Sequence, residues 1–295
     1  MTMETVLSQY HDQQERVKRF FDSAESWKGK MYSDREDRFN RAMIRRKEYA
    51  FKMLRRADDL TIGRSLDIGC GCGVYSKELE HMGFEICGVD VSPEMIEECR
   101  NNLSIPESEF GKRFMTADVE QLPFETESFD LVLSIGVFGY LLNDDAALKE
   151  IVRVLKPGGH FYLSVQNIVS ASNFDYAVRA WIKNRLRGAS TKEVALPVPW
   201  VTSHSSTHMF YKSYYPGRLK QAVTEYGFSP VDEVSLGYEL RIVRRLGLLS
   251  NAALISVEEA LERFARLFPV VPLKYAGDTY SILFQKNKIK GIQGS

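Results

Sequence analysis

The chain has 295 residues, with 39 basic and 39 acidic side chains and no net charge. This length is enough for one large domain with an insertion, and the balanced charge excludes the positive field that holds a nucleic-acid backbone. We therefore expect no nucleic-acid partner.

The compartment is inferred from apolar runs and cysteines. The longest apolar run, residues 131–142, is shorter than the ~20 residues that span a bilayer, and the polar N-terminal sequence lacks the apolar core of a secretory signal. The four cysteines show no paired CxxC spacing, so we interpret them as small buried thiols in a reducing compartment. We expect a cytoplasmic protein without membrane contact.

The predicted elements begin with helices and continue with strands and helices in alternation. Residues 4–58 carry apolar side chains at helical spacing among many charges, with an interruption at 26–34. From residue 64 onward, short apolar runs alternate with amphipathic segments. Strands are expected at 64–69, 85–91, 112–120, 129–136 and 160–167, and helices at 73–83, 92–103 and 145–159. This order predicts an α/β fold with a doubly wound parallel sheet, whose ligands lie at the carboxyl ends of the strands.

The alternation stops after residue 167. The aromatic, proline-broken segment 168–215 is interpreted as a substrate-binding lid, because long segments between sheet elements usually carry function. A helix at 216–228, a strand at 229–240 and a final strand at 277–287 return to the sheet. Four parts result: an N-terminal helical cap (1–58), a core (59–167), the lid (168–215) and the rest of the sheet with a helical insertion (216–295).

The leucine-rich, basic segment 241–268 predicts an amphipathic helix. Such a helix covers a sheet, forms a homodimer contact or touches a membrane surface, and we favour the first two.

The stretch LDIGCGCG, residues 66–73, places glycines at 69, 71 and 73 directly after an apolar run. The dinucleotide fingerprint needs its third glycine at position 74, where a valine stands, and this weakens an NAD-dependent oxidoreductase interpretation. Asp90 ends the second strand, where a carboxylate accepts ribose hydroxyls, and Asp118 ends the third, where one accepts from an exocyclic amine.

Five motifs together resemble one family. LDIGCGCG, GVDVSPEMI, ADVEQLPF, SFDLVLSIGVF and VLKPGGHFYLS stand in the order found in the class I S-adenosylmethionine-dependent methyltransferases, small-molecule branch. The resemblance covers residues 60–166. It implies a Rossmann-like sheet of seven strands with the last one antiparallel, S-adenosylmethionine as the cofactor and S-adenosylhomocysteine as the product.

The resemblance also implies roles for single residues. Asp67 and Gly69 would flank the methionine part, Asp90 would hold the ribose, and Asp118 with the Val119 amide would bind the adenine edge. Val91 and Met95 would pack on the adenine, and Ser134 would offer its carbonyl to the amine. The full cofactor-binding set is Asp67, Gly69, Cys70, Gly71, Gly73, Asp90, Val91, Met95, Asp118, Val119, Ser134 and Ile135.

The sequence defines the residues that bind the methyl acceptor less closely than those that bind the cofactor. Methyl transfer is an in-line displacement that depends on alignment, and residues 134–144 lack the Asn/Asp-Pro-Pro-aromatic signature of nucleobase methyltransferases. We expect a small-molecule acceptor, apolar or aromatic, and no metal, since Asp144 and Asp145 are expected to begin a helix. The candidate catalytic residues are His204, His208 and Tyr211.

The aromatic residues outside the cofactor half suggest where the acceptor would be enclosed. Because the N-terminal segment often closes over the cofactor in the resembling family, Tyr10, His11, Trp27 and Tyr32 are expected near the site. The alternative to a methyltransferase is a non-catalytic module of the same fold that binds the cofactor or activates a partner.

Overall fold

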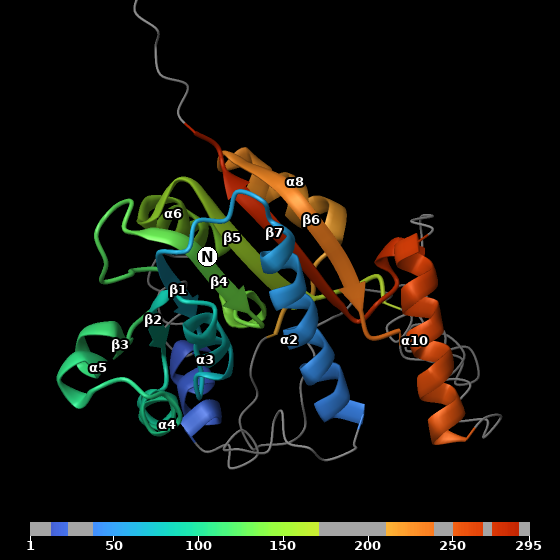
Figure 1. The fold of residues 1–295 in the computed structure, drawn as a ribbon, viewed down its shortest axis with the longest axis horizontal. Coiled ribbons are helices and arrows are strands. Elements are labelled where there is room, and N and C mark those ends of the chain that lie inside the picture. Colours follow the sequence, from blue (N-terminus) through green and yellow to red (C-terminus); the bar gives the residue numbers. More distant parts are fainter. Residues whose placement is uncertain (1–12, 23–37, 171–210, 239–249, 268–272, 289–295) are drawn as a thin grey trace, which may run out of the picture.

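The computed structural model describes residues 13–22, 38–170, 211–238, 250–267 and 273–288. Its centre is a seven-stranded sheet of order β3-β2-β1-β4-β5-β7-β6 (Figure 1). The strands are β1 (Arg64–Ile68), β2 (Glu85–Asp90), β3 (Phe114–Thr116), β4 (Phe129–Ile135), β5 (Leu155–Gln166), β6 (Phe228–Leu236) and β7 (Thr279–Lys286).

The strand directions confirm the expected architecture. Strands β1 to β5 pair in parallel, whereas β7 runs antiparallel to both β5 and β6. Strand β1 lies between β2 and β4, and the strand order runs outward in opposite directions from β1 and β4, so the carboxyl ends of these two strands form the switch point where ligands bind in such sheets.

Helices cover both faces of the sheet. They are α2 (Arg38–Arg56), α3 (Val74–His81), α4 (Pro93–Asn102), α5 (Glu107–Arg113), α6 (Asp144–Val154), α8 (Pro216–Glu225) and α10 (Asn251–Leu267), with short 3-10 turns η1 (Phe138–Tyr140) and η3 (Leu273–Tyr275). Residues 13–22 are also helical. One buried cluster joins α2, α3 and α4 to the sheet and the other joins α6 and α8 to its opposite face. Strand β4 is apolar on both sides for this reason.

Several element boundaries differ from the sequence predictions. Helix α5 was not predicted, because its seven residues ESEFGKR include a single buried apolar side chain, Phe110. Helix α6 ends at Val154 and does not continue through the Pro-Gly-Gly sequence at 157–159. Strand β5 begins at Leu155, and its pairing with β4 contains a register shift. The expected start of α6 at Asp144 is confirmed, and the Asn143 side chain caps it by accepting from the Ala146 amide.

The N-terminal and C-terminal helical predictions are partly covered by the described residues. The helices at 13–22 and 38–56 lie within the predicted 4–58, and α10 lies within the predicted 241–268. Among the described residues, no helix combines the length and apolar character needed to cross a membrane.

The segment interpreted as a lid is described only at its two ends. Residues 168–170 follow β5 and residues 211–215 lead into α8, while 171–210 lie outside the described residues. The two ends meet at a parallel bridge between Asn167 and Tyr214. The Asn167 side chain also donates to the Gly277 carbonyl at 2.7 Å, which fixes this end of β5 to the turn before β7.

Candidate functional site

The three glycines after β1 adopt backbone angles that side chains avoid, with φ of +67° at Gly69, +52° at Gly71 and +80° at Gly73. Their surroundings differ. A Cβ on Gly69 would lie 2.2 Å from Cγ2 of Val137, and one on Gly73 would lie 2.8 Å from Sγ of Cys99, whereas one on Gly71 would meet no atom within 4 Å. Gly69 and Gly73 therefore permit packing within the protein, and Gly71 faces open space.

A buried carboxyl group, Asp67, and a half-buried one, Asp90, stand at the carboxyl ends of β1 and β2. Asp90 accepts from the Gly71 amide and from the Ser92 amide, both at 2.9 Å, so it holds the glycine loop against the start of α4. Asp67 accepts from the Ser76 hydroxyl at 2.7 Å. Burial raises the pKa of Asp67 to about 7 and that of Asp90 to about 6.

A third carboxyl group, Asp118, follows β3. One of its oxygens accepts from the Glu120 amide at 3.0 Å, and the other accepts from the side-chain amide of Gln14. The helix at residues 13–22 thus supplies a hydrogen-bond donor to Asp118.

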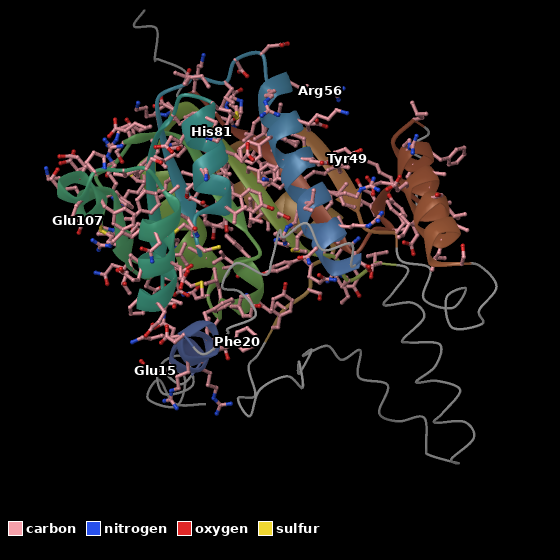
Figure 2. The ribbon with its side chains drawn as sticks, turned by 60° about the horizontal axis from the view of Figure 1, so that its bottom comes forward. Glu15, Phe20, Tyr49, Arg56, His81 and Glu107 are labelled. Carbon is pink, nitrogen blue, oxygen red and sulfur yellow. The ribbon has the colours of Figure 1, made fainter. Side chains whose placement is uncertain are left out.

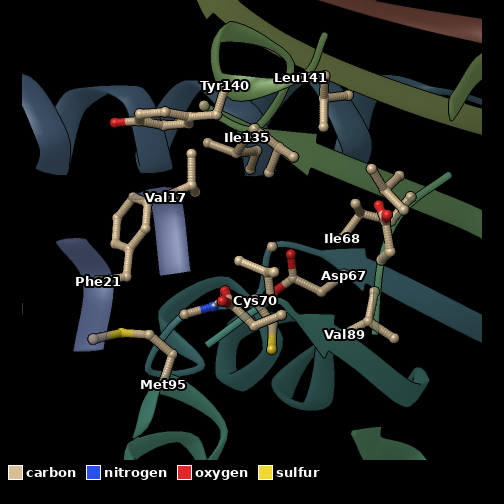
Figure 3. Close-up of a pocket in the computed structure, with 18 of the residues that line it drawn as sticks. Val17, Phe21, Asp67, Ile68, Cys70, Val89, Met95, Ile135, Tyr140 and Leu141 are labelled. Atoms are coloured by element: carbon tan, nitrogen blue, oxygen red, sulfur yellow. Dashed lines mark hydrogen bonds between the residues drawn. The ribbon is translucent and has the colours of Figure 1, made fainter. Parts of the chain in front are cut away.

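These groups surround one cavity of about 340 Å³ (Figure 3). The predicted residues that line it are Asp67, Gly69, Cys70, Gly71, Asp90, Val91, Met95, Asp118, Val119, Ile135 and Tyr211. We refer to the residues from the ends of β1, β2 and β3 and the glycine loop as the floor of this cavity.

Two predicted cofactor residues do not line the cavity. Ser134 is fully buried one residue before the end of β4, in register with Ile68 of β1 and Leu163 of β5. Its successor Ile135, which belongs to the same predicted set, lines the cavity. Gly73 serves as the N-cap of α3 and packs against Cys99. His204 and His208 lie outside the described residues, as do Tyr10, His11, Trp27 and Tyr32.

The opposite side of the cavity, which we name the roof, consists of the helix at 13–22 with Tyr140 and Tyr211. In Figure 3, Val17, Phe21 and Tyr140 lie across the cavity from Asp67, Ile68 and Val89. The Phe21 ring meets the Tyr140 ring edge-on at 5.4 Å between centroids, and Tyr140 meets Tyr211 at 4.8 Å. Figure 2 shows the same helix, marked by Glu15 and Phe20, at the opposite end of the molecule from Arg56.

The roof was anticipated in part: the resemblance implied that the N-terminal segment closes over the cofactor, and Tyr211 was a candidate residue, whereas Tyr140 was not singled out. The helical spacing of Val17, Phe20 and Phe21 indicated an apolar face, but nothing local indicated what that face covers. Gln13 donates from its side chain to the Tyr140 carbonyl at 3.2 Å across 127 positions of sequence. Contacts of this range are not encoded in either segment alone.

The tyrosines of the roof are hydrogen-bond donors rather than bases. Burial raises the pKa of the Tyr211 phenol, and burial likewise raises the pKa of Tyr140. The ring of Tyr211 lies against Gly139, where a Cβ would come within 2.4 Å of Cε2. Tyr211 is thus fixed in place and protonated at neutral pH.

In the described part of the chain, no three His, Cys, Asp or Glu side chains gather as a metal site would require. The expected metal independence stays a prediction, because His204 and His208 are not described. All four cysteines are free thiols; Cys72 is partly exposed and the others are buried.

Comparison with known proteins agrees with this geometry. Residues 66–163 match the family model described as a methyltransferase domain. A sterol 4-C-methyltransferase of Caenorhabditis elegans is 34% identical over 117 residues, covering 37% of this chain and 32% of that protein. A ubiquinone biosynthesis O-methyltransferase of Xanthomonas oryzae is 33% identical over 115 residues, covering 39% of this chain and 47% of that protein. Residues 66–163 of the chain are therefore similar to the methyltransferase domains of these proteins.

The chain spans about a third to a half of the length of these curated relatives. Among solved structures, the cyclase SpnF superposes with a TM-score of 0.56 at 18% identity, over 94% of this chain and 97% of its own. The magnesium protoporphyrin IX methyltransferase of Synechocystis superposes with a TM-score of 0.55 at 13% identity, over 93% and 100%. These two confirm the Rossmann-like fold.

Proposed function

We propose that the chain is an S-adenosylmethionine-dependent methyltransferase that acts on a small apolar or aromatic acceptor. The observation that carries the proposal is one cavity in which a glycine-loop floor with acidic side chains faces an aromatic roof. The sequence relatives reported above are named as a sterol 4-C-methyltransferase and a ubiquinone biosynthesis O-methyltransferase, which supports a small-molecule acceptor. Which atom of the acceptor is methylated is left open.

The floor fits the cofactor. Gly71 leaves open space where any side chain would stand, so its backbone is free to contact a ligand. Asp90 uses one lone pair of each oxygen on a backbone amide, and the remaining lone pairs are available to ribose hydroxyls. Asp118 and the Val119 amide would bind the adenine edge, and Met95 and Val91 would pack on its face.

The roof fits the acceptor. When bound, the cofactor supplies an electrophilic methyl group at the sulfonium; the chain must then hold the acceptor in line with it and exclude water. Phe21, Tyr140 and Leu141 present apolar surface to the cavity, and the Tyr211 hydroxyl is a donor that can orient a polar atom of the acceptor. His204 and His208 remain candidates for an acid/base role.

Titration calorimetry with S-adenosylhomocysteine tests the cofactor site. We expect binding by the wild type and a loss of about tenfold or more in Asp90→Asn, because a charged acceptor of hydrogen bonds becomes neutral. Glu85→Gln is the matched control, since Glu85 begins the same strand that Asp90 ends and is exposed. Absence of binding by the wild type would refute the proposal.

Turnover separates the enzyme from a non-catalytic module. Incubation with methyl-labelled cofactor and extracts or candidate apolar acceptors should give a labelled product heavier by one methylene. Cofactor binding with no labelled product in any fraction, together with a partner protein recovered by affinity capture, would favour the module.

A further inference from the structure

A second cavity, of about 210 Å³, lies between α2, β6, α10 and η3. It shares no lining residue with the cavity between the floor and the roof. Figure 2 shows Tyr49 and Arg56, two residues of α2 that line the second cavity, away from the helix that carries Glu15 and Phe20. The second cavity is therefore separate from the proposed cofactor site.

Positive side chains outnumber negative ones around the second cavity. Among the described residues that line it, Lys52 and Arg56 of α2 and Lys274 of η3 are basic, and Asp232 and Glu233 of β6 are acidic. The sum favours an anionic ligand over a cationic one. Which basic residues are available to that ligand depends on the partners that each already has.

Glu233 is already balanced by lysines. It forms ion pairs with Lys274 and, at 3.2 Å, with Lys220 of α8, and it accepts a hydrogen bond from the Tyr280 hydroxyl. Lys220 does not line the second cavity. Two lysines thus neutralise this carboxylate, and the charge of Lys274 is engaged before any ligand arrives.

Lys52 and Arg56 have no counter-ion among the described residues. They are four positions apart, so they lie on one side of α2, and both are exposed. Nζ of Lys52 lies 5.7 Å from the centre of the Tyr49 ring, a contact that leaves its charge unpaired. Asp232 accepts from the Glu233 amide at 2.8 Å and pairs with neither of the two. Like charges at this spacing destabilise a helix, and an anion bound between them removes the repulsion.

Ser235 of β6 supplies an independent indication of a ligand. It lines the same cavity, it is only 3% exposed, and its hydroxyl oxygen has no hydrogen-bond partner among the described residues. A buried hydroxyl without a partner is unfavourable, so such groups normally meet a water molecule or a ligand. Since Lys52 and Arg56 are exposed, the cavity has its unpaired charges at the solvent side and a hydroxyl at its inner end.

We propose that the second cavity binds a small phosphate ester, with the phosphate held by Lys52 and Arg56 and a hydroxyl of the organic part bound by Ser235. A phosphate monoester carries up to two negative charges and three acceptor oxygens, which match two unpaired basic side chains, whereas a carboxylate would leave one of them unpaired. A bare phosphate ion would fill only part of a cavity of about 210 Å³. The inference goes beyond the proposed function and does not depend on it.

Titration calorimetry on the full chain at pH 8 and constant ionic strength tests the inference with glycerol 3-phosphate and inorganic phosphate. We expect saturable binding of both, tighter for glycerol 3-phosphate. Lys52→Gln and Arg56→Gln should each weaken both probes about 5- to 10-fold. Ser235→Ala should weaken glycerol 3-phosphate about 3- to 10-fold and leave inorganic phosphate unchanged. Arg55→Gln removes the same charge from the next position of α2, outside the lining, and as the control should change neither.

Four results would overturn the inference. The first is a wild type that binds neither probe. The second is binding that persists in the Lys52→Gln/Arg56→Gln double variant or falls equally in Arg55→Gln, which would show a site elsewhere or a general effect of charge. The third is unchanged glycerol 3-phosphate binding in Ser235→Ala, which would leave the phosphate on the surface of α2. The fourth is acetate that binds as tightly as inorganic phosphate.

Discussion

The floor and the roof of the cavity are built in opposite ways. The floor comes from adjacent strand ends, and its central contact, Asp90 to the Gly71 amide, joins residues 19 positions apart. The roof brings together segments from three distant parts of the chain, and its contact from Gln13 to the Tyr140 carbonyl spans 127 positions. A rigid local floor suits a cofactor that is always the same, whereas a roof built from separate elements can be changed to suit the acceptor.

The largest expected effect falls on the floor. Gly71→Ala should weaken S-adenosylhomocysteine binding roughly 10- to 100-fold, because a methyl group would fill the space that the ligand needs and cost about 1–3 kcal/mol. It should also destabilise the fold by about 1–2 kcal/mol, because φ is +52° there.

Gly227→Ala is the control for that strain. Gly227 has a φ of +86° and open space around it, but it lies before β6, away from the cavity. The same loss of stability with unchanged calorimetric binding is expected. Equal binding losses in the two variants would show that backbone strain, and not ligand contact, explains the glycine at position 71.

The next effect is the pH dependence of cofactor binding. Burial raises the pKa of Asp90 to about 6, and ribose hydroxyls donate better to its ionised form. Affinity should therefore be level at high pH and fall as the pH drops through about 6, by up to about tenfold per pH unit. Calorimetry between pH 5 and pH 8 measures this. In Asp90→Asn the affinity should be lower and the profile flatter, and an unchanged slope would assign the titration to another group.

A smaller effect is expected on the roof. Tyr211→Phe should lower kcat by roughly 3- to 10-fold through loss of one donated hydrogen bond, and leave S-adenosylhomocysteine binding unchanged. Tyr215→Phe is the matched control, because Tyr215 is 42% exposed and does not line the cavity. If Tyr211→Phe weakened cofactor binding instead, the floor and the roof would not be functionally separate.

The smallest effect concerns stability without ligand. Burial raises the pKa of Asp67 from the ordinary 3.8 to about 7, so the folded state holds a proton that the unfolded state has lost. Stability should therefore fall as the pH rises from about 4 to about 7 and stay level above. Thermal melts should show the wild type losing roughly 3 °C per pH unit relative to Asp67→Asn in this window. Parallel curves would mean that Asp67 is ionised in the folded protein.

Much of the core was predictable because its signals are local. The alternation of apolar runs and amphipathic helices predicted the strands from β1 to β5, and Ser92 with Pro93 marked the start of α4, where the Ser92 hydroxyl accepts from the Met95 amide. The positions of Asp67, Asp90 and Asp118 at strand ends follow from the same pattern. Ser134 shows the limit of this pattern: of the two neighbouring residues predicted at the end of β4, the side chain of Ser134 is buried and only Ile135 lines the cavity.

The sequence by itself determined the sheet, the glycine loop and the acidic strand ends, because helix periodicity, left-handed glycine angles and strand alternation depend on neighbours within a few residues. Only the tertiary structure decided which side chains of residues 13–22 reach the cavity, that Gln14 contacts Asp118, and that Arg46 of α2 lines the cavity while Arg45 pairs with Glu262 of α10. These contacts depend on how separate elements pack across the sheet. No local pattern specifies which of two adjacent arginines turns toward a cavity, since that choice is made by partners far along the chain.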